Sequence, residues 1–256
     1  MLKLSNLAKK HQKLSGLIIG KKNFFEADKV IHIFSIQKGI VRANVKGARR
    51  PGSKLAGSTE LFTLGEFDIV KGKNLDILVS AHPTCHFENA CGNLDNVSDY
   101  FVVSEILQKL MPEEVPNEKI YSETVSLFQA LDRGCHKYLT GLYVYKLIIL
   151  LGYGLDLGKC AKCKKNESSK EGYHINFKEG SIICTQCMRH SNLTAITADE
   201  LKVLRFIEHS DFGKYSKINM PEQTAKNISH MVFEYLDFIY QNEFKSRRFA
   251  NALKNL

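Results

Sequence analysis

The sequence predicts an α+β protein, with a β-rich N-terminal domain followed by an α-helical one. Apolar and polar residues alternate in the first third of the chain, as in IVRANVKG (40–47), and this period of two is typical of half-buried strands. After about residue 85 the apolar residues recur at helical spacing instead. Two pairs of cysteines then interrupt the helical part. We therefore expect domains over residues 1–80 and 81–256, with a cysteine module at about residues 158–190.

Five short runs in the N-terminal domain are typical of strands. They are LSGLIIG, VIHIFSI, IVRANVKG, GEFDIV and LDILVS. Turn-forming sequences containing Gly, Pro or Asn separate several of them, at Gln37–Gly39, Arg50–Gly52 and Lys71–Asn74. About five antiparallel strands within ~70 residues predict a small barrel or a sandwich.

The C-terminal domain has the apolar spacing of several helices. The predicted helices are 97–110, SETVSLFQALDRG, HKYLTGLYVYKLIILLG, DELKVLRFIEHS, and a long segment through Tyr240 with Pro221 in its first turn. Pro112 ends the first of them, because proline cannot continue a helix. Thr197 and Glu200 have the spacing of a capping box at the start of DELKVLRFIEHS. The third helix is apolar enough to form the core of a bundle.

Positive charge is concentrated in the N-terminal domain. Residues 1–80 contain 15 Lys and Arg against 6 Asp and Glu, an excess equal to the net charge of +9 for the whole chain. This asymmetry suggests a polyanionic partner, nucleic acid before an anionic membrane, and a basic face that serves solubility alone is the equal alternative from charge alone. No apolar run reaches the roughly 18 residues that a membrane span needs, and no signal peptide is evident. We expect a cytoplasmic protein.

The loop KGARRPGSKLAG (46–57) resembles a phosphate-binding P-loop in its glycine spacing but not in its chemistry. A P-loop needs Gly-Lys followed by Ser or Thr, whereas the order here is Gly-Ser-Lys. A turn into a strand, rather than a helix, is expected after it. Four cations spaced along the loop suit an extended phosphate backbone instead. They are Lys46, Arg49, Arg50 and Lys54, and Arg42, Lys21 and Lys22 extend the same basic face. The alternative is a solvated charged loop.

Four of the cysteines have the spacing of a metal site. Cys160 and Cys163 are separated by two residues, as are Cys184 and Cys187, and 20 residues lie between the pairs. This spacing predicts one four-thiolate Zn²⁺ site, which is structural because four protein ligands leave no position for a catalytic water. Lys178-Glu179-Gly180 predicts a hairpin that folds the second pair back onto the first. Redox-active or unrelated cysteines are the alternative.

Several of these segments together resemble the RecO family of bacterial recombination mediators. The resemblance rests on EADKVIHIFSIQKGIVRANVKGARRPGSKLAG, GEFDIVKGKNLD, LLGYGLDLGKCAKC and YLDFIYQNEFKSRR, and it spans roughly residues 14–250. Phe25 stands where the family often has Gly, and Gly154 where it usually has Pro. The first dozen residues form an extension that the resemblance does not cover.

The resemblance implies an OB-fold barrel followed by a helical domain carrying a zinc module. It implies binding of single- and double-stranded DNA and annealing of complementary strands. It also implies partnership with RecR and with the acidic tail of single-strand DNA-binding protein, so that RecA loads onto coated strands. The expected setting is the RecFOR pathway of gap repair and homologous recombination, linked to DNA damage and the SOS response, in association with the nucleoid.

Three other functions compete with this interpretation. One is a zinc-containing OB-fold protein that acts on RNA or at a polymerase. Another is an enzyme, which we do not expect because the Walker A, HExxH and GxSxG motifs are missing from the sequence. The third is an interaction scaffold without affinity for nucleic acid, which the basic N-terminal domain disfavours. The sequence leaves open where partner proteins dock and whether the chain self-associates.

Overall fold

The computed structural model describes residues 11–87, 94–134, 138–165, 172–188, 193–241, 244 and 246. The N-terminal extension and the end of the YLDFIYQNEFKSRR segment lie largely outside these residues. The chain forms two compact units, one of Met1–Tyr121 with Arg248–Leu256 and one of Ser122–Arg247. The first unit therefore extends past the barrel and includes the first long helix.

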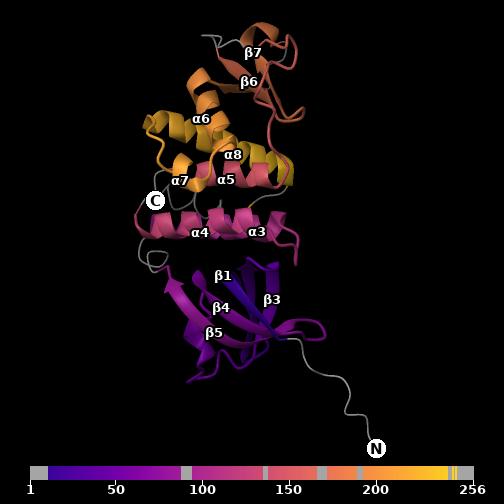
Figure 1. Cartoon of the computed structure of the whole chain (residues 1–256), viewed down its shortest axis with the longest axis vertical. Helices are drawn as coiled ribbons and strands as arrows, with labels where there is room; N and C mark the ends of the chain where they lie inside the picture. Colours follow the sequence, from indigo (N-terminus) through magenta and orange to yellow (C-terminus); the bar gives the residue numbers. More distant parts are fainter. Residues whose placement is uncertain are drawn as a thin grey trace, which may run out of the picture. The chain divides into compact units, whose positions relative to one another are not determined.

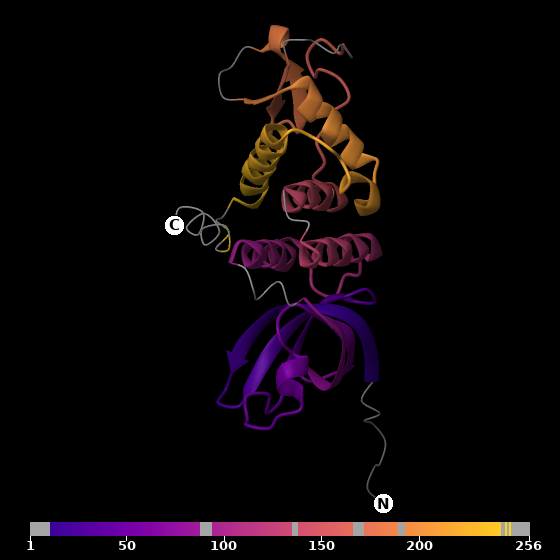
Figure 2. The same cartoon turned by 90° about the vertical axis from the view of Figure 1, so that its left-hand side faces the viewer.

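The first unit is built on a closed five-stranded barrel with the strand order β1-β2-β3-β5-β4 (Figures 1 and 2). The strands are β1 (His11–Phe24), β2 (Asp28–Ser35), β3 (Gly39–Val45), β4 (Thr63–Val70) and β5 (Asp76–His86). β1 pairs antiparallel with both β2 and β4, while β3 and β5 pair in parallel and close the barrel. This is the five-stranded OB-fold arrangement, and it confirms the predicted fold class.

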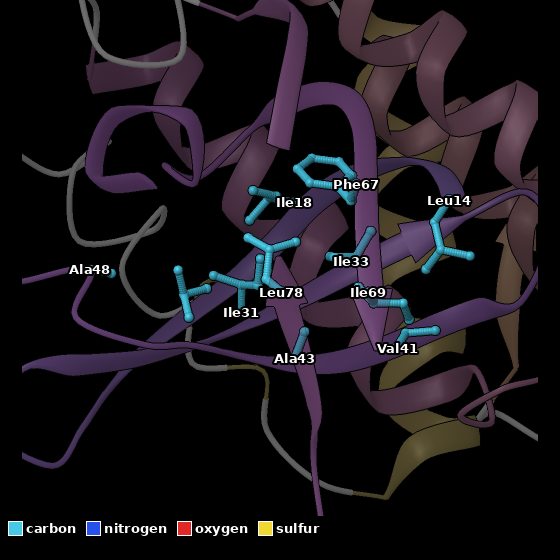
Figure 3. Packing of buried hydrophobic residues seen from close by; sticks show 11 residues of the cluster. Leu14, Ile18, Ile31, Ile33, Val41, Ala43, Ala48, Phe67, Ile69 and Leu78 are labelled. Atoms are coloured by element: carbon cyan, nitrogen blue, oxygen red, sulfur yellow. The ribbon is translucent and has the colours of Figure 1, made fainter. Parts of the chain in front are cut away.

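The alternating sequence fills the barrel with aliphatic side chains. In β3, Val41 and Ala43 are buried whereas Arg42 between them is exposed, as the period of two requires. All five strands contribute to the core, and Figure 3 shows their side chains converging inside the barrel. The cluster consists of Leu14, Ile18, Ile31, Ile33, Val41, Ala43, Val45, Ala48, Phe67, Ile69 and Leu78. Because the core consists of apolar side chains, the polar side chains that alternate with them in the strands lie on the outer surface of the barrel.

The helix α3 (Leu94–Leu110) packs against β1 of the barrel. The Nε2 of Gln108 donates to the backbone oxygen of Ile19 over 2.8 Å, and the ring of Tyr100 lies 5.2 Å from that of Phe62. After the helix the chain pairs with β3 through a bridge between Ile40 and Glu113. These contacts explain why the first compact unit continues to Tyr121.

The second unit is helical apart from the cysteine module. It contains most of α4 (Glu118–Asp132), then α5 (Leu139–Leu150), α6 (Ala198–Glu208), α7 (Phe212–Tyr215) and α8 (Glu222–Tyr240). Every residue from Leu139 through Ile148 is buried, so α5 is the core helix that the sequence predicts (Figure 1). None of the described helices is both long and apolar enough to cross a membrane.

A lysine lies in the middle of this apolar helix. The Nζ of Lys146 donates to the backbone oxygens of Ile207 and Glu208, each over 2.9 Å, at the end of α6. The last carbonyls of a helix have no partner within the helix and carry partial negative charge, so a cation suits them. The capping box at the start of α6 is also confirmed, because the side chains of Thr197 and Glu200 each accept from the other's backbone N–H.

Two local predictions were wrong in detail. Pro221 precedes the first residue of α8 and serves as its N-cap, whereas the sequence placed it in the first turn. The basic loop was expected to turn directly into a strand, but a one-turn helix, α1 (Leu55–Ser58), comes between them. Four residues with a glycine among them carry no periodic signal, so the sequence could not reveal this turn.

Candidate nucleic-acid interface and metal centre

The cysteine module is a small sheet built on the predicted hairpin. β6 (Tyr173–Asn176) and β7 (Ser181–Cys184) pair antiparallel around the turn, where Gly180 adopts a φ of 58°. β8 (Thr194–Ile196), which the sequence did not predict, adds a third strand beside β6. The short helix η1 (Thr185–Cys187) carries the chain from the second strand to the last cysteine.

The four predicted cysteines come together at one end of this module. The Sγ atoms of Cys160, Cys163, Cys184 and Cys187 all lie within 4.8 Å of one another. The pair formed by Cys163 and Cys184 is 3.9 Å apart. Four sulfurs about 2.3 Å from a central tetrahedral metal would be separated by about 3.8 Å. The cluster is thus compatible with a structural metal site.

The backbone around Cys160 favours the thiolate form of this one cysteine, whereas burial raises the pKa of Cys184 and hydrogen bonding to the neighbouring thiols raises that of Cys187. The N–H of Cys184 donates to the Sγ of Cys160 over 3.4 Å. Burial raises the pKa of the Cys160 thiol, but donation from the N–H groups of Cys163 and Cys184 outweighs burial and lowers it to about 6. These N–H groups hold the sulfur in place and stabilise its negative charge.

The basic loop between β3 and β4 is fastened to the turn between β1 and β2. The backbone N–H of Arg49 donates to the oxygen of Ala27 over 2.9 Å, and its Nη1 donates to the oxygens of Phe25 and Glu26 over 3.3 and 3.0 Å. The carboxylate of Asp28 accepts from the backbone N–H of Gly47 over 2.8 Å. This bond is the main reason that the pKa of Asp28 is lowered. The two segments therefore form one fixed platform.

The predicted DNA-binding cations divide into two groups on the barrel. Arg42 forms an ion pair with Glu113 over 3.0 Å, and Lys21 forms one with Glu60. The other group is exposed and makes no ion pair among the described residues of the chain. Its members are Lys22, Lys46, Arg50 and Lys54. Arg49 is intermediate, because its guanidinium is exposed yet already bonded to two backbone oxygens.

Three features of this region were not found by sequence reasoning. Lys29 is buried, and its Nζ donates to the oxygen of Ala56 and to Glu60, which fixes the one-turn helix after the loop. Glu113 lies on the surface and forms an ion pair with Arg42, a pairing that the sequence did not predict. Phe25, at the tip of the β1–β2 turn, is 77% exposed. Its substitution for the family's usual Gly was the only signal in the sequence that pointed to it.

Comparison with known proteins covers nearly the whole chain. Residues 10–87 match the family Recombination protein O N terminal, and residues 93–248 match Recombination protein O C terminal. The chain is 24% identical over 247 residues to the DNA repair protein RecO of Dehalococcoides mccartyi, covering 94% of this chain and 96% of that protein.

Two further relatives have the same name. The identity is 25% over 246 residues to the DNA repair protein RecO of Halalkalibacterium halodurans, with 95% and 96% of the two chains covered. It is also 25% over 246 residues to that of Listeria monocytogenes, with 94% of each chain covered. With both family matches in chain order and the OB-fold barrel in place, the chain belongs to the RecO family of recombination proteins, whose relatives here are named for DNA repair.

Proposed function

We propose that this protein is a recombination mediator that binds DNA through its barrel and anneals complementary strands. The observation that carries the proposal is the fastened basic loop, on which Lys46, Arg50 and Lys54 are exposed and form no ion pair with any residue that the structure describes. A cation outside any such ion pair can meet a phosphate without first breaking one. An OB-fold barrel with a cationic surface is a platform of the kind used for single strands.

Annealing follows from the same charges. Two complementary strands repel each other through their phosphates, and a protein that neutralises some of these charges lowers the barrier to their encounter. Contacts to phosphates carry no sequence information, so the loop would act on any pair of complementary strands and on duplexes. We propose no catalytic step and no nucleotide hydrolysis, because Ser53 and Lys54 stand in the wrong order for a P-loop.

The remaining parts of the proposal concern partners and the metal. We propose that RecR and the acidic tail of single-strand DNA-binding protein are its partners, the tail binding in the helical domain, and that RecA is loaded indirectly. The four-cysteine cluster would hold one Zn²⁺, which would cross-link the module and take no part in a reaction. The setting proposed is the bacterial cytoplasm, at sites of DNA repair.

The test is annealing of complementary strands coated with single-strand DNA-binding protein. We expect this protein to accelerate duplex formation from coated strands, as followed by fluorescence energy transfer between labelled oligonucleotides. The matched control is the variant in which Lys46, Arg50 and Lys54 are replaced by Ala. Equal rates with and without the protein would contradict the proposal. A preference for RNA over DNA in competition binding would favour the RNA-binding alternative instead.

A further inference from the structure

A large apolar side chain projects from the barrel outside its hydrophobic core. Phe25 is 77% exposed, the most exposed of the large apolar residues described in the structure. It also adopts a φ of 49°, a left-handed conformation that is unfavourable for a residue with a Cβ atom. Both features act against folding, and glycine would avoid both. An aromatic residue here points to a function outside the folded core.

The backbone around Phe25 is held in place by hydrogen bonds, and its surroundings are positively charged. Its ring lies 4.3 Å from that of Phe24, centroid to centroid. Its backbone oxygen accepts from Arg49, which also fastens the turn to the basic loop. Lys46 and Arg50 lie close enough to Asp28, three residues along the chain, to lower the pKa of its carboxyl group. An exposed aromatic face therefore stands beside cations on a fixed platform.

We propose that Phe25 is a stacking platform for an unpaired nucleobase of a single DNA strand. This inference rests on the proposed DNA-binding function and adds to it a contact that distinguishes single strands from duplexes. Bases carry a planar face for stacking, and their phosphates suit the neighbouring cations. In a duplex the faces of the bases are already covered by neighbouring base pairs. Phe25 could therefore stack on a duplex base only after two base pairs had been separated, which costs free energy.

The composition of the turn favours a base over an anionic membrane as the occupant. Glu26 and Ala27, the other residues of the turn, add one negative charge and one small side chain. Insertion into a lipid interface needs a larger apolar surface than a single ring provides. Stacking on one base needs only one ring, and it contributes about 1–3 kcal/mol per base.

The absence of tryptophan from the sequence provides a direct test. Phe25→Trp places the only tryptophan at the proposed platform, and stacking should quench its fluorescence. We expect quenching by an oligothymidylate but not by an abasic oligonucleotide of equal length that binds through its phosphates. Phe206→Trp, at a 45% exposed position on α6, is the matched control and should not be quenched. Equal quenching by the two oligonucleotides, or quenching by anionic lipid vesicles instead, would overturn the proposal.

A second variant separates stacking from folding. Phe25→Gly removes the ring and suits the positive φ, so it should fold at least as stably as the parent. We expect its affinity for oligothymidylate to fall by about 5- to 150-fold, the equivalent of one lost stacking contact, and its affinity for the abasic strand to stay unchanged. Unchanged affinity for oligothymidylate would overturn the stacking proposal while leaving phosphate binding by the loop intact. Failure of the parent protein to bind any strand would overturn both.

Discussion

The loop can be tested through the salt dependence of single-strand binding. The informative variant replaces Lys46, Arg50 and Lys54 together by Ala, because these exposed loop cations make no ion pair within the described residues. Arg49 is left in place, since its guanidinium and its backbone N–H fasten the loop to the β1–β2 turn. The change therefore removes charge without loosening the platform.

The magnitude follows from counterion release. Each phosphate neutralised on a single strand contributes about 0.7 to the slope of log K against log salt, so three contacts contribute about 2. Between 50 and 200 mM salt, the affinity of the parent should then fall about 20-fold more than that of the variant. Adding Arg49→Ala to the set should bring the loss of slope to roughly 3 only if the Arg49 guanidinium also binds a phosphate in addition to the turn.

A control variant separates contact from overall charge. Lys13, Lys38 and Lys109 lie in the same unit but already pair with carboxylates over 2.6, 3.6 and 2.7 Å. Replacing these three by Ala removes the same charge, yet it should leave the slope nearly unchanged, because only the long-range field is altered. Fluorescence anisotropy of a labelled oligothymidylate, titrated at several salt concentrations, measures all the slopes. Equal slopes for the loop variant and the parent would refute the reasoning, and the basic face would have to act through Lys21, Lys22 and Arg42.

Three other predictions concern the metal, pH and packing. Purified protein should contain about one zinc per chain, and Cys187→Ser should lower both the zinc content and the melting temperature; a fully chelated chain of unchanged stability would contradict this. The pKa of Asp28 is lower in the folded chain than its ordinary 3.8. The contribution of its carboxylate to the free energy of unfolding is therefore complete above pH 3.8, and it is lost as the pH falls through the folded pKa. The difference in unfolding free energy between the parent and Asp28→Asn should therefore shrink on acidification, and a constant difference down to pH 3 would disprove the assignment. Gly141→Ala would place a Cβ 2.9 Å from that of Ser229, so chemical denaturation should show a loss of about 1–3 kcal/mol.

The barrel was predictable because its signals are local. Each strand carries its own alternation, and the residues that alternate inward in β3 are the ones that are buried. The cysteine pairs were equally informative, since their spacing alone determines which sulfurs can reach one metal. β8 was missed because three residues are too few to show a period.

Local sequence signals could not show which of the candidate DNA-binding cations already have partners within the protein. Arg42 and Glu113 are 71 positions apart in the sequence, and their ion pair depends on the chain returning to β3 after α3. The role of Arg49 likewise depends on a turn more than 20 residues earlier. Composition reveals that a surface is basic, but only the fold determines which of its charges already have partners.

Lys146 has a consequence for how the second unit acquires a unique arrangement. Because α5 is apolar on nearly every side, contacts between hydrophobic surfaces would tolerate several rotations and translations of α6 along it. Hydrogen bonds are directional, and the ammonium group satisfies the carbonyls of Ile207 and Glu208 in one alignment only. A slip by a single residue would leave a buried charge without its acceptors, a penalty of several kcal/mol. The least apolar residue of the core helix is thus the one that selects a single packing from many that hydrophobicity alone would permit.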